Sequence, residues 1–249
     1  MLLQLSSWPE VEAYLSRSKG IIVPIGSTEQ HGPNGLIGTD ALCPEIIAHQ
    51  AAAQADILVG PTFNVGMAQH HMAFPGSMTL RPSTMIAAIA DWTASLVRHG
   101  FERIYWFNGH GGNIQPIGTA FSEIYAMSSL RQAQGNQAAP RLSLRNWWEL
   151  PGIGELCREI FPVGEGSHAT ASEVSVTYYG YPQAQKLVEM SPKIAPTGFF
   201  RDADDYRRKF PDGRIGSDPS QASPEKGERI VKAAVPALIA DFTAFLSAA

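Results

Sequence analysis

The chain has 249 residues and a mass of 26.9 kDa, enough for one α/β domain or two small ones. Its 19 Lys and Arg residues against 23 Asp and Glu residues give a net charge of −4, which argues against a nucleic-acid-binding protein. Hydrophobic residues make up 44%, which excludes wholesale disorder. Charged residues make up only 17%, which favours surfaces buried in an oligomer.

Cysteine content and hydropathy bear on where the protein works. Cys43 and Cys157 are the two cysteines, too few for a disulfide framework or a thiolate zinc cluster, so a reducing cytoplasm is expected. The N-terminal apolar run is too short for a signal peptide. Two long stretches without charge, 57–80 and 104–122, contain Gly, His, Asn and Gln, so no membrane span is expected.

The predicted elements alternate between helix and strand in the first 150 residues. A capping signal at Ser7 predicts a helix to about Ser18, and the apolar run 21–25 predicts a buried strand. Further helices are predicted over about 41–55, from about 83 to Gly100, and after the loop 108–113. Further strands are predicted at 57–59, 103–107 and 141–147. This alternation predicts an α/β fold with a largely parallel sheet covered on both faces.

The pattern weakens after residue 148. The segment 191–223 is rich in Pro, Gly and charge and is either a lid or an ordered excursion. Ser223 and Pro224 predict the start of a final helix that reaches Leu246, with a kink expected at Pro236. In parallel sheets ligands bind at the carboxyl ends of the strands, so the loops after Ile25 and Phe107 are where we expect the site.

The first of these loops, 26–40, holds two carboxylates and an imidazole within 12 residues. Glu29 and His31 lie two apart and point to the same side of an extended backbone. Asp40 stands at the entrance of the next predicted helix, where a simple N-cap is the competing explanation. The second loop, 108–113, places His110 among glycines, which let the backbone turn sharply beside a ligand. Together these residues favour a metal site over coincidence.

A third cluster, 166–173, places His168 before a predicted helix and Glu173 inside it. Three carboxylates and two imidazoles without a thiolate favour Zn²⁺, Mn²⁺ or Fe²⁺ and suffice for two ions with one carboxylate bridging. Such paired ions activate a water and polarise a carbonyl or phosphoryl group. Glu165 competes with Glu173 as the fifth ligand, but its Gly-flanked loop predicts a solvated side chain or one at a subunit edge.

In this combination of motifs the chain resembles the creatininase (creatinine amidohydrolase) family. The resemblance rests on Glu29-Gln30-His31-Gly32-Pro33, Gly38-Thr39-Asp40, Asn108-Gly109-His110-Gly111-Gly112-Asn113, His168-Ala169 and Glu173, with 71–77 similar to the family's H-x-x-F-P-G-[ST] segment. It implies a single domain over residues 1–249, a three-layer sandwich with a central, mostly parallel sheet flanked by helices, a binuclear metal centre and often a homohexamer. Members of the family open cyclic amides, deformylate formamides or cleave peptide-like bonds.

The resemblance also implies roles for individual residues. Residues at metal-ligand positions, with Asp40 as the bridge, are Glu29, His31, Asp40, His110 and Glu173. His168 matches the substrate-side histidine and is expected to act as general acid, the competing explanation being a helix cap. Residues expected to bind substrate are His71, Ser77 and Trp147, although aromatic pairs such as Trp147-Trp148 are often core. As strand neighbours, His70 and His71 would face opposite ways, His71 toward the site.

Two departures bear on the substrate. Gly112 stands where creatinine hydrolases carry a ligating Glu, and Asn34-Gly35-Leu36-Ile37 replaces the family's His-Leu-Pro-Leu run. The predicted function is therefore a binuclear-metal hydrolase with two divalent ions per chain, whose metal-bound hydroxide attacks a small molecule at a non-peptide or cyclic C–N amide bond. A metal-dependent phosphoesterase is the first alternative, but near the site loops only Arg145 offers a cation for phosphate. A non-catalytic metal-binding assembly protein is the second.

Overall fold

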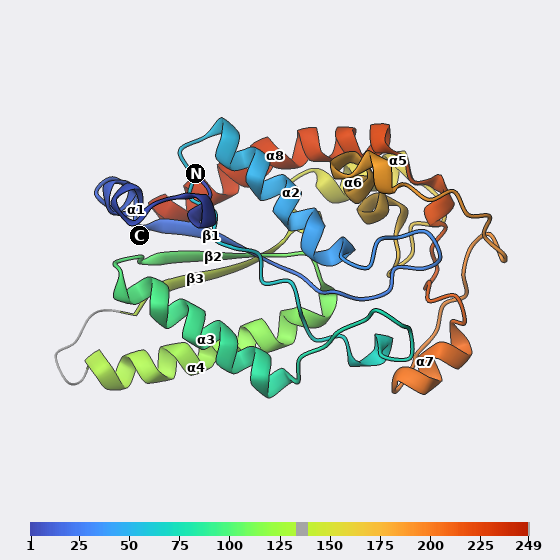
Figure 1. Ribbon diagram of the computed structural model, residues 1–249, viewed down its shortest axis with the longest axis horizontal. Helices are drawn as coiled ribbons and strands as arrows, with labels where there is room; N and C mark the ends of the chain where they lie inside the picture. The colour runs from blue at the N-terminus through green and yellow to red at the C-terminus, as the bar shows by residue number, and fades with distance from the viewer. Residues whose placement is uncertain (133–138, 249) are drawn as a thin grey trace.

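The computed structural model describes residues 1–132 and 139–248 (Figure 1). Its strands are β1 (Gly20–Ile25), β2 (Arg103–Asn108) and β3 (Arg141–Asn146). Its α-helices are α1 (Trp8–Leu15), α2 (Thr39–Gln54), α3 (Pro82–Arg98), α4 (Ile114–Gln132), α5 (Ile153–Ile160), α6 (Ala171–Gly180), α7 (Ala203–Lys209) and α8 (Pro224–Ser247). The three strands pair in the order β1-β2-β3, and both pairs are parallel, as the sequence predicts.

Helices cover both faces of this sheet, with α2 and α8 on one side and α3 and α4 on the other (Figure 1). Alternate strand residues face opposite layers, so Ile22 and Tyr105 pack toward α8 while Val23 and Trp106 pack toward α3 and α4. The prediction of a three-layer α/β sandwich is confirmed.

The predicted strand at 57–59 is only partly correct. Val59 forms isolated parallel bridges with Leu2 and Ile22, and Phe63 forms one with Ile25, but no regular strand results. Pro24 in β1 has no N–H, yet its carbonyl still accepts a hydrogen bond from Phe63 N at 2.9 Å. The segment therefore covers the outer edge of β1 without extending the sheet.

The last helix, α8, is long and apolar enough to cross a membrane by length and composition alone. In this fold one side of the helix, which includes Ile230, Leu238 and Phe242, is fully buried in the core shared with α2. The helix runs unbroken through Pro236, which lies on its exposed side, so the predicted helix is confirmed, while the kink at Pro236 stays a prediction.

The segment 191–223 is an ordered excursion that contains α7. The guanidinium of Arg214 is fully buried, pairs with Asp212 at 2.7 Å and donates to the carbonyls of Pro192, Lys193 and Ser217. A buried charge with this many partners is costly to release, because each lost contact would leave a desolvated donor. These contacts hold the segment itself together, and the carbonyl of Gly213, which accepts from Gln30 Nε2 at 2.8 Å, joins it to the loop after β1.

Candidate metal centre

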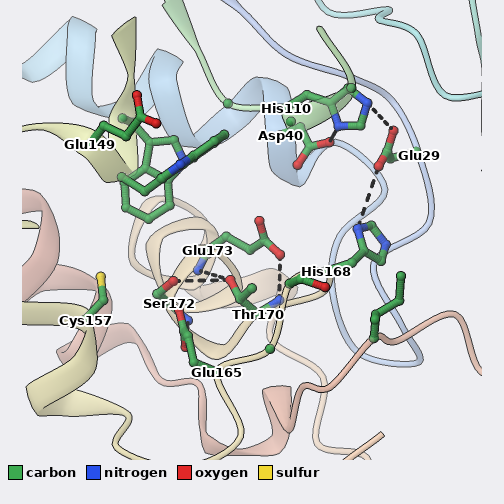
Figure 2. A pocket seen from close by; sticks show the side chains of 18 of the residues that line it. Glu29, Asp40, His110, Glu149, Cys157, Glu165, His168, Thr170, Ser172 and Glu173 are labelled. Carbon is green, nitrogen blue, oxygen red and sulfur yellow. Dashed lines mark hydrogen bonds and ion pairs between the residues drawn. The ribbon is translucent and has the colours of Figure 1, made fainter. Parts of the chain in front are cut away.

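The predicted ligands come from three loops that meet at the carboxyl ends of β1 and β2. Glu29 and His31 follow β1, His110 follows β2, and Glu173 lies in the first turn of α6. Asp40 lies in the first turn of α2, whose N-cap is Gly38, so capping does not explain Asp40. Figure 2 shows Glu29, Asp40, His110 and Glu173 on the wall of one cavity.

Asp40 occupies the middle of the cluster and is almost fully buried. Its Oδ1 lies 2.9 Å from His31 Nε2, and its Oδ2 lies 2.8 Å from His110 Nδ1. Each carboxylate oxygen therefore faces a different imidazole. This is the arrangement that a carboxylate bridging two ions requires.

Main-chain carbonyls determine which nitrogen each imidazole presents. His31 Nδ1 lies 3.0 Å from the carbonyl oxygen of Glu29, and His110 Nε2 lies 3.0 Å from that of Met67. A carbonyl oxygen only accepts, so these two nitrogens carry hydrogen, and in the neutral rings His31 Nε2 and His110 Nδ1 hold the lone pairs. Those are the nitrogens that face Asp40.

The two glutamates complete the cluster from opposite sides. Glu29 is fully buried; its Oε2 accepts from Ser27 Oγ at 2.7 Å and lies 3.3 Å from His110 Nε2. Glu173 Oε1 lies 3.9 Å from His31 Nε2 and accepts the main-chain N–H of Thr170 at 2.6 Å. Because Thr170 is the N-cap of α6 and Glu173 the third residue, this pair forms a capping box that fixes the carboxylate.

Two ligand sets that share Asp40 follow from these contacts. One consists of Glu29, Asp40 and His110, the other of His31, Asp40 and Glu173, and in each the ligand atoms lie within 4.8 Å of one another. Glu29 Oε1 and Asp40 Oδ2 are buried and accept no hydrogen bond, although imidazole nitrogens stand 3.0 and 2.8 Å away outside hydrogen-bond geometry. Buried carboxylate oxygens without a donor are costly unless a cation balances them, so the residues fit a pair of divalent ions.

The protonation of the cluster shows the same need for positive charge. Burial lowers the pKa of His31, but Asp40 outweighs it and raises the pKa to about 10. Burial likewise opposes the charge on His110, yet Glu29 and Asp40 raise its pKa to about 9. Burial raises the pKa of Glu173 to about 7, although His31 opposes it. Without metal, protons on the imidazoles thus balance the carboxylates.

His168 and His71 lie beside the two sets that share Asp40, and His168 forms a third group with Glu29 and His31 whose ligand atoms lie within 4.8 Å of one another. His168 Nδ1 is 3.8 Å from Glu29 Oε1, and His71 Nε2 is 3.0 Å from the same oxygen. Burial, then the neighbouring His71 and His31, lowers the pKa of His168 well below its usual value. Burial lowers the pKa of His71 to about 3, so both rings are neutral at pH 7. Thr170 is the N-cap of α6, so the competing explanation of His168 as its cap is wrong.

A cavity of about 680 Å³ opens beside the cluster. Its walls include Trp147, predicted to contact substrate, and Glu165, which the sequence placed in solvent or at a subunit edge. Glu165 is instead half-buried and accepts the N–H of Ser172 at 3.3 Å, at the start of α6. Ser77, also predicted to contact substrate, is not among the cavity residues; its Oγ accepts the Gln30 N–H at 3.1 Å.

Sequence reasoning missed two residues near the metal cluster. His70, expected to face away from the site, lines the cavity, because residues 69–71 form a 3₁₀ turn rather than a strand and His70 therefore does not point opposite to His71. Gln30, which no spacing argument singled out, lies between His71 and His168. The signal that could have indicated Gln30 was its place in the sequence, directly between the predicted ligands Glu29 and His31.

Comparison with known proteins places this geometry in a family. The family described as Creatininase: Creatinine amidohydrolase matches residues 4–242. The chain belongs to the creatininase family. Creatinine amidohydrolase of Pseudomonas putida is 26% identical over 242 residues, which cover 92% of this chain and 91% of that protein.

Other members show the breadth of the family. Mycofactocin precursor peptide peptidase of Mycolicibacterium smegmatis is 31% identical over 106 residues, 40% of this chain and 42% of that protein. The 3-dehydro-scyllo-inosose hydrolase of Thermotoga maritima is 29% identical over 109 residues, 43% of this chain and 35% of that protein. A manganese creatininase superposes with a TM-score of 0.82 at 25% identity over 99% of both chains. A Zn–Zn creatininase mutant, at 23% identity and a TM-score of 0.85 over 99% of this chain and 98% of that chain, shares the fold.

Proposed function

We propose that this creatininase-family hydrolase uses two divalent ions to hydrolyse a non-peptide or cyclic C–N amide bond of a small molecule. The observation that carries the proposal is Asp40, whose two oxygens face His31 and His110 separately, with Glu29 and Glu173 completing the two sets. Zinc and manganese are the first candidates, since related structures are titled as Zn–Zn and Mn forms. When bound, such ions supply a nucleophilic water near neutral pH and polarise a carbonyl oxygen.

The chain's own residues would then position the substrate and move protons. The cavity volume of about 680 Å³ suits a small molecule, and Trp147 and Trp148 on its wall offer faces for a planar heterocycle. His168 lies next to Glu29 and is neutral, so it can carry a proton to the departing nitrogen after the carbonyl has been attacked. Glu29 and Glu173 would hold the two ions.

The phosphoesterase alternative gains no support from the cavity. Among the described residues that line it, Arg158 carries the one guanidinium or ammonium group, and its exposed side chain pairs with Glu155 at 3.1 Å. Arg145 instead forms a bidentate pair with Asp241 at 3.1 Å. A phosphate ester would therefore meet few cations besides the metal ions.

A substrate screen tests the proposed function. The protein reconstituted with zinc or manganese is assayed against cyclic amides, formamides and ureides, with a generic phosphoester and a short peptide as competing classes. Turnover of an amide with inertness toward the phosphoester is expected. Hydrolysis of the phosphoester alone would replace the proposal, and hydrolysis of the peptide alone would move the bond to the peptide class.

The His168→Ala variant then separates proton transfer from metal binding. We expect turnover to fall by about 10²–10⁴ because a general acid is lost, while metal content stays the same. Loss of one metal equivalent would make His168 a ligand, which its distance to Glu29 and His31 also permits. Unchanged turnover would remove His168 from the mechanism.

A further inference from the structure

The side chain of Gln30 is a buried amide that joins three separate parts of the chain. Its Oε1 accepts the main-chain N–H of Gly32 at 2.8 Å, and its Nε2 donates to the carbonyl of Gly213 at 2.8 Å. Because a main-chain N–H only donates and a carbonyl only accepts, these two contacts fix which end of the amide is nitrogen. One hydrogen of Nε2 is then left for one further acceptor.

His71 is the first ring whose hydrogen position follows. Its Nδ1 lies 2.9 Å from Gln30 Nε2 and must accept, so Nδ1 is unprotonated. In the neutral ring the hydrogen is on Nε2, which lies 3.0 Å from Glu29 Oε1. His71 therefore directs an N–H toward a carboxylate of the metal centre.

His168 is the second ring. Its Nε2 lies 2.9 Å from the main-chain oxygen of Gln30 and equally 2.9 Å from the side-chain Nε2 of Gln30. An unprotonated nitrogen at that distance from a carbonyl oxygen would set two lone pairs against each other, so Nε2 carries hydrogen and donates to the carbonyl. The two amide hydrogens of Gln30 then go to Gly213 and His71, so the 2.9 Å contact between Gln30 Nε2 and His168 Nε2 is not a hydrogen bond.

We propose that Gln30 is the positioning residue that sets the tautomers of both histidines beside the metal centre. Its side-chain amide leaves the hydrogen of His71 on Nε2, the atom 3.0 Å from Glu29 Oε1, and its main-chain carbonyl leaves the lone pair of His168 on Nδ1, the atom 3.8 Å from the same oxygen. Resting on the proposed function, this turns the lone pair of His168 and the N–H of His71 toward the same carboxylate of the metal centre.

The surroundings of Gln30 are built to hold it in place. Its own N–H donates to Ser77 Oγ at 3.1 Å, and Tyr206 Oη donates to the Gly213 carbonyl at 2.8 Å. Gly213 has a φ of +86°, and a Cβ there would lie 1.9 Å from Gln30 Oε1. The segment 191–223 thus supplies, through Gly213 and Tyr206, one of the acceptors that orient the amide.

Ring-nitrogen NMR of the zinc-loaded protein tests this directly, because long-range ¹H–¹⁵N spectra distinguish the two neutral tautomers. Signals are assigned with His71→Asn and His168→Asn, and no substrate is needed. We expect the hydrogen on Nε2 of both rings. A hydrogen on Nδ1 of either ring would overturn the proposal even if the enzyme hydrolyses amides, and the expected spectrum would stand even if no amide is hydrolysed.

Variants of Gln30 test the side-chain role. Gln30→Glu keeps the oxygen that accepts from Gly32 but removes both amide hydrogens, so His71 should move its hydrogen to Nδ1 while His168, bound to the main chain, stays as it is. Zinc affinity should fall about 10–100-fold, as expected when a partner of a ligating carboxylate is lost. Gln30→Met should show the same loss of affinity.

The matched control is Gln50→Met, a half-buried glutamine on α2. Its tautomer pattern and zinc affinity should equal those of the wild type. An unchanged His71 tautomer in Gln30→Glu, or unchanged zinc affinity in both Gln30 variants, would refute the side-chain role. If both variants fail to fold, the wild-type spectrum alone still decides the proposal.

Discussion

Loading the metal-free protein with zinc should release protons from His31 and His110. The carboxylates of Asp40 and Glu29 raise the pKa of these imidazoles, against the effect of burial, to about 10 and about 9. At pH 8 both rings therefore carry an extra proton, which sits on the nitrogen that faces Asp40. A metal ion binds only the neutral ring, so each proton must leave when zinc enters.

The magnitude follows from these values. Two imidazolium protons per chain leave at pH 8, and a zinc-bound water with a pKa near 7 adds about one more at most. The pKa of Glu173, raised by burial to about 7, leaves that carboxyl largely ionised at pH 8, so it contributes little. We therefore expect between about two and about three protons per chain.

The sign of the pH dependence is equally specific. Since protons compete with zinc for both rings, affinity should rise about tenfold per pH unit for each site between pH 7 and 8 and level off above the raised pKa values. Proton release is measured by calorimetry in buffers of different ionisation enthalpy, and affinity by competition with a chelator. Release of about one proton or fewer, or an affinity independent of pH, would show that at least one imidazole is already neutral.

Three further expectations concern the ligands and the assembly. The wild type should hold two metal equivalents by elemental analysis, and Asp40→Asn should lose both, because a neutral amide is a poor bridge; full occupancy would make Asp40 a structural residue. Glu173→Gln should lose one metal equivalent, because glutamine preserves the capping box of α6 but not the negative charge, while Glu165→Gln should keep both. The reverse pattern would move the ligand to Glu165. Light scattering should report a homo-oligomer, which we expect to be a hexamer, and the mass of a single chain would contradict this.

Much of the fold could be predicted because its signals are local. The apolar runs at 21–25 and 103–107 form β1 and β2 to within a residue or so, and glycine ends the helix at 100. The segment 57–59 was harder, because a short apolar run does not reveal whether it pairs regularly. It makes single bridges only.

The site could be predicted in part for a topological reason. Residues that follow neighbouring parallel strands must meet at one edge, so Glu29, His31 and His110 converge as their positions in the chain indicated. The orientation of Gln30 could not be foreseen, because it depends on Gly213, 183 residues further along the chain. Glu165 was misplaced for a similar reason, as its partner is the start of α6.

The last prediction concerns Gly112, where creatinine hydrolases carry a ligating Glu. A Cβ at this position would lie 2.4 Å from His110 Nε2 and 2.7 Å from the Met67 carbonyl, the pair that fixes the ring. Any side chain here must therefore turn His110 away from that carbonyl, so in this chain the carboxylate has to come from elsewhere, and Glu173 on α6 is the residue we propose for it.

Gly112→Ala should consequently lower metal occupancy toward one equivalent, because His110 no longer presents Nδ1 to Asp40. Gly111→Ala is the matched control, since a Cβ there meets no heavy atom within 4 Å among the described residues. Elemental analysis after reconstitution measures both, and circular dichroism checks that each variant is folded. If Gly112→Ala keeps two metal equivalents, His110 still binds metal with its ring displaced. The lack of space for a side chain at 112 would then not explain a fifth ligand on α6.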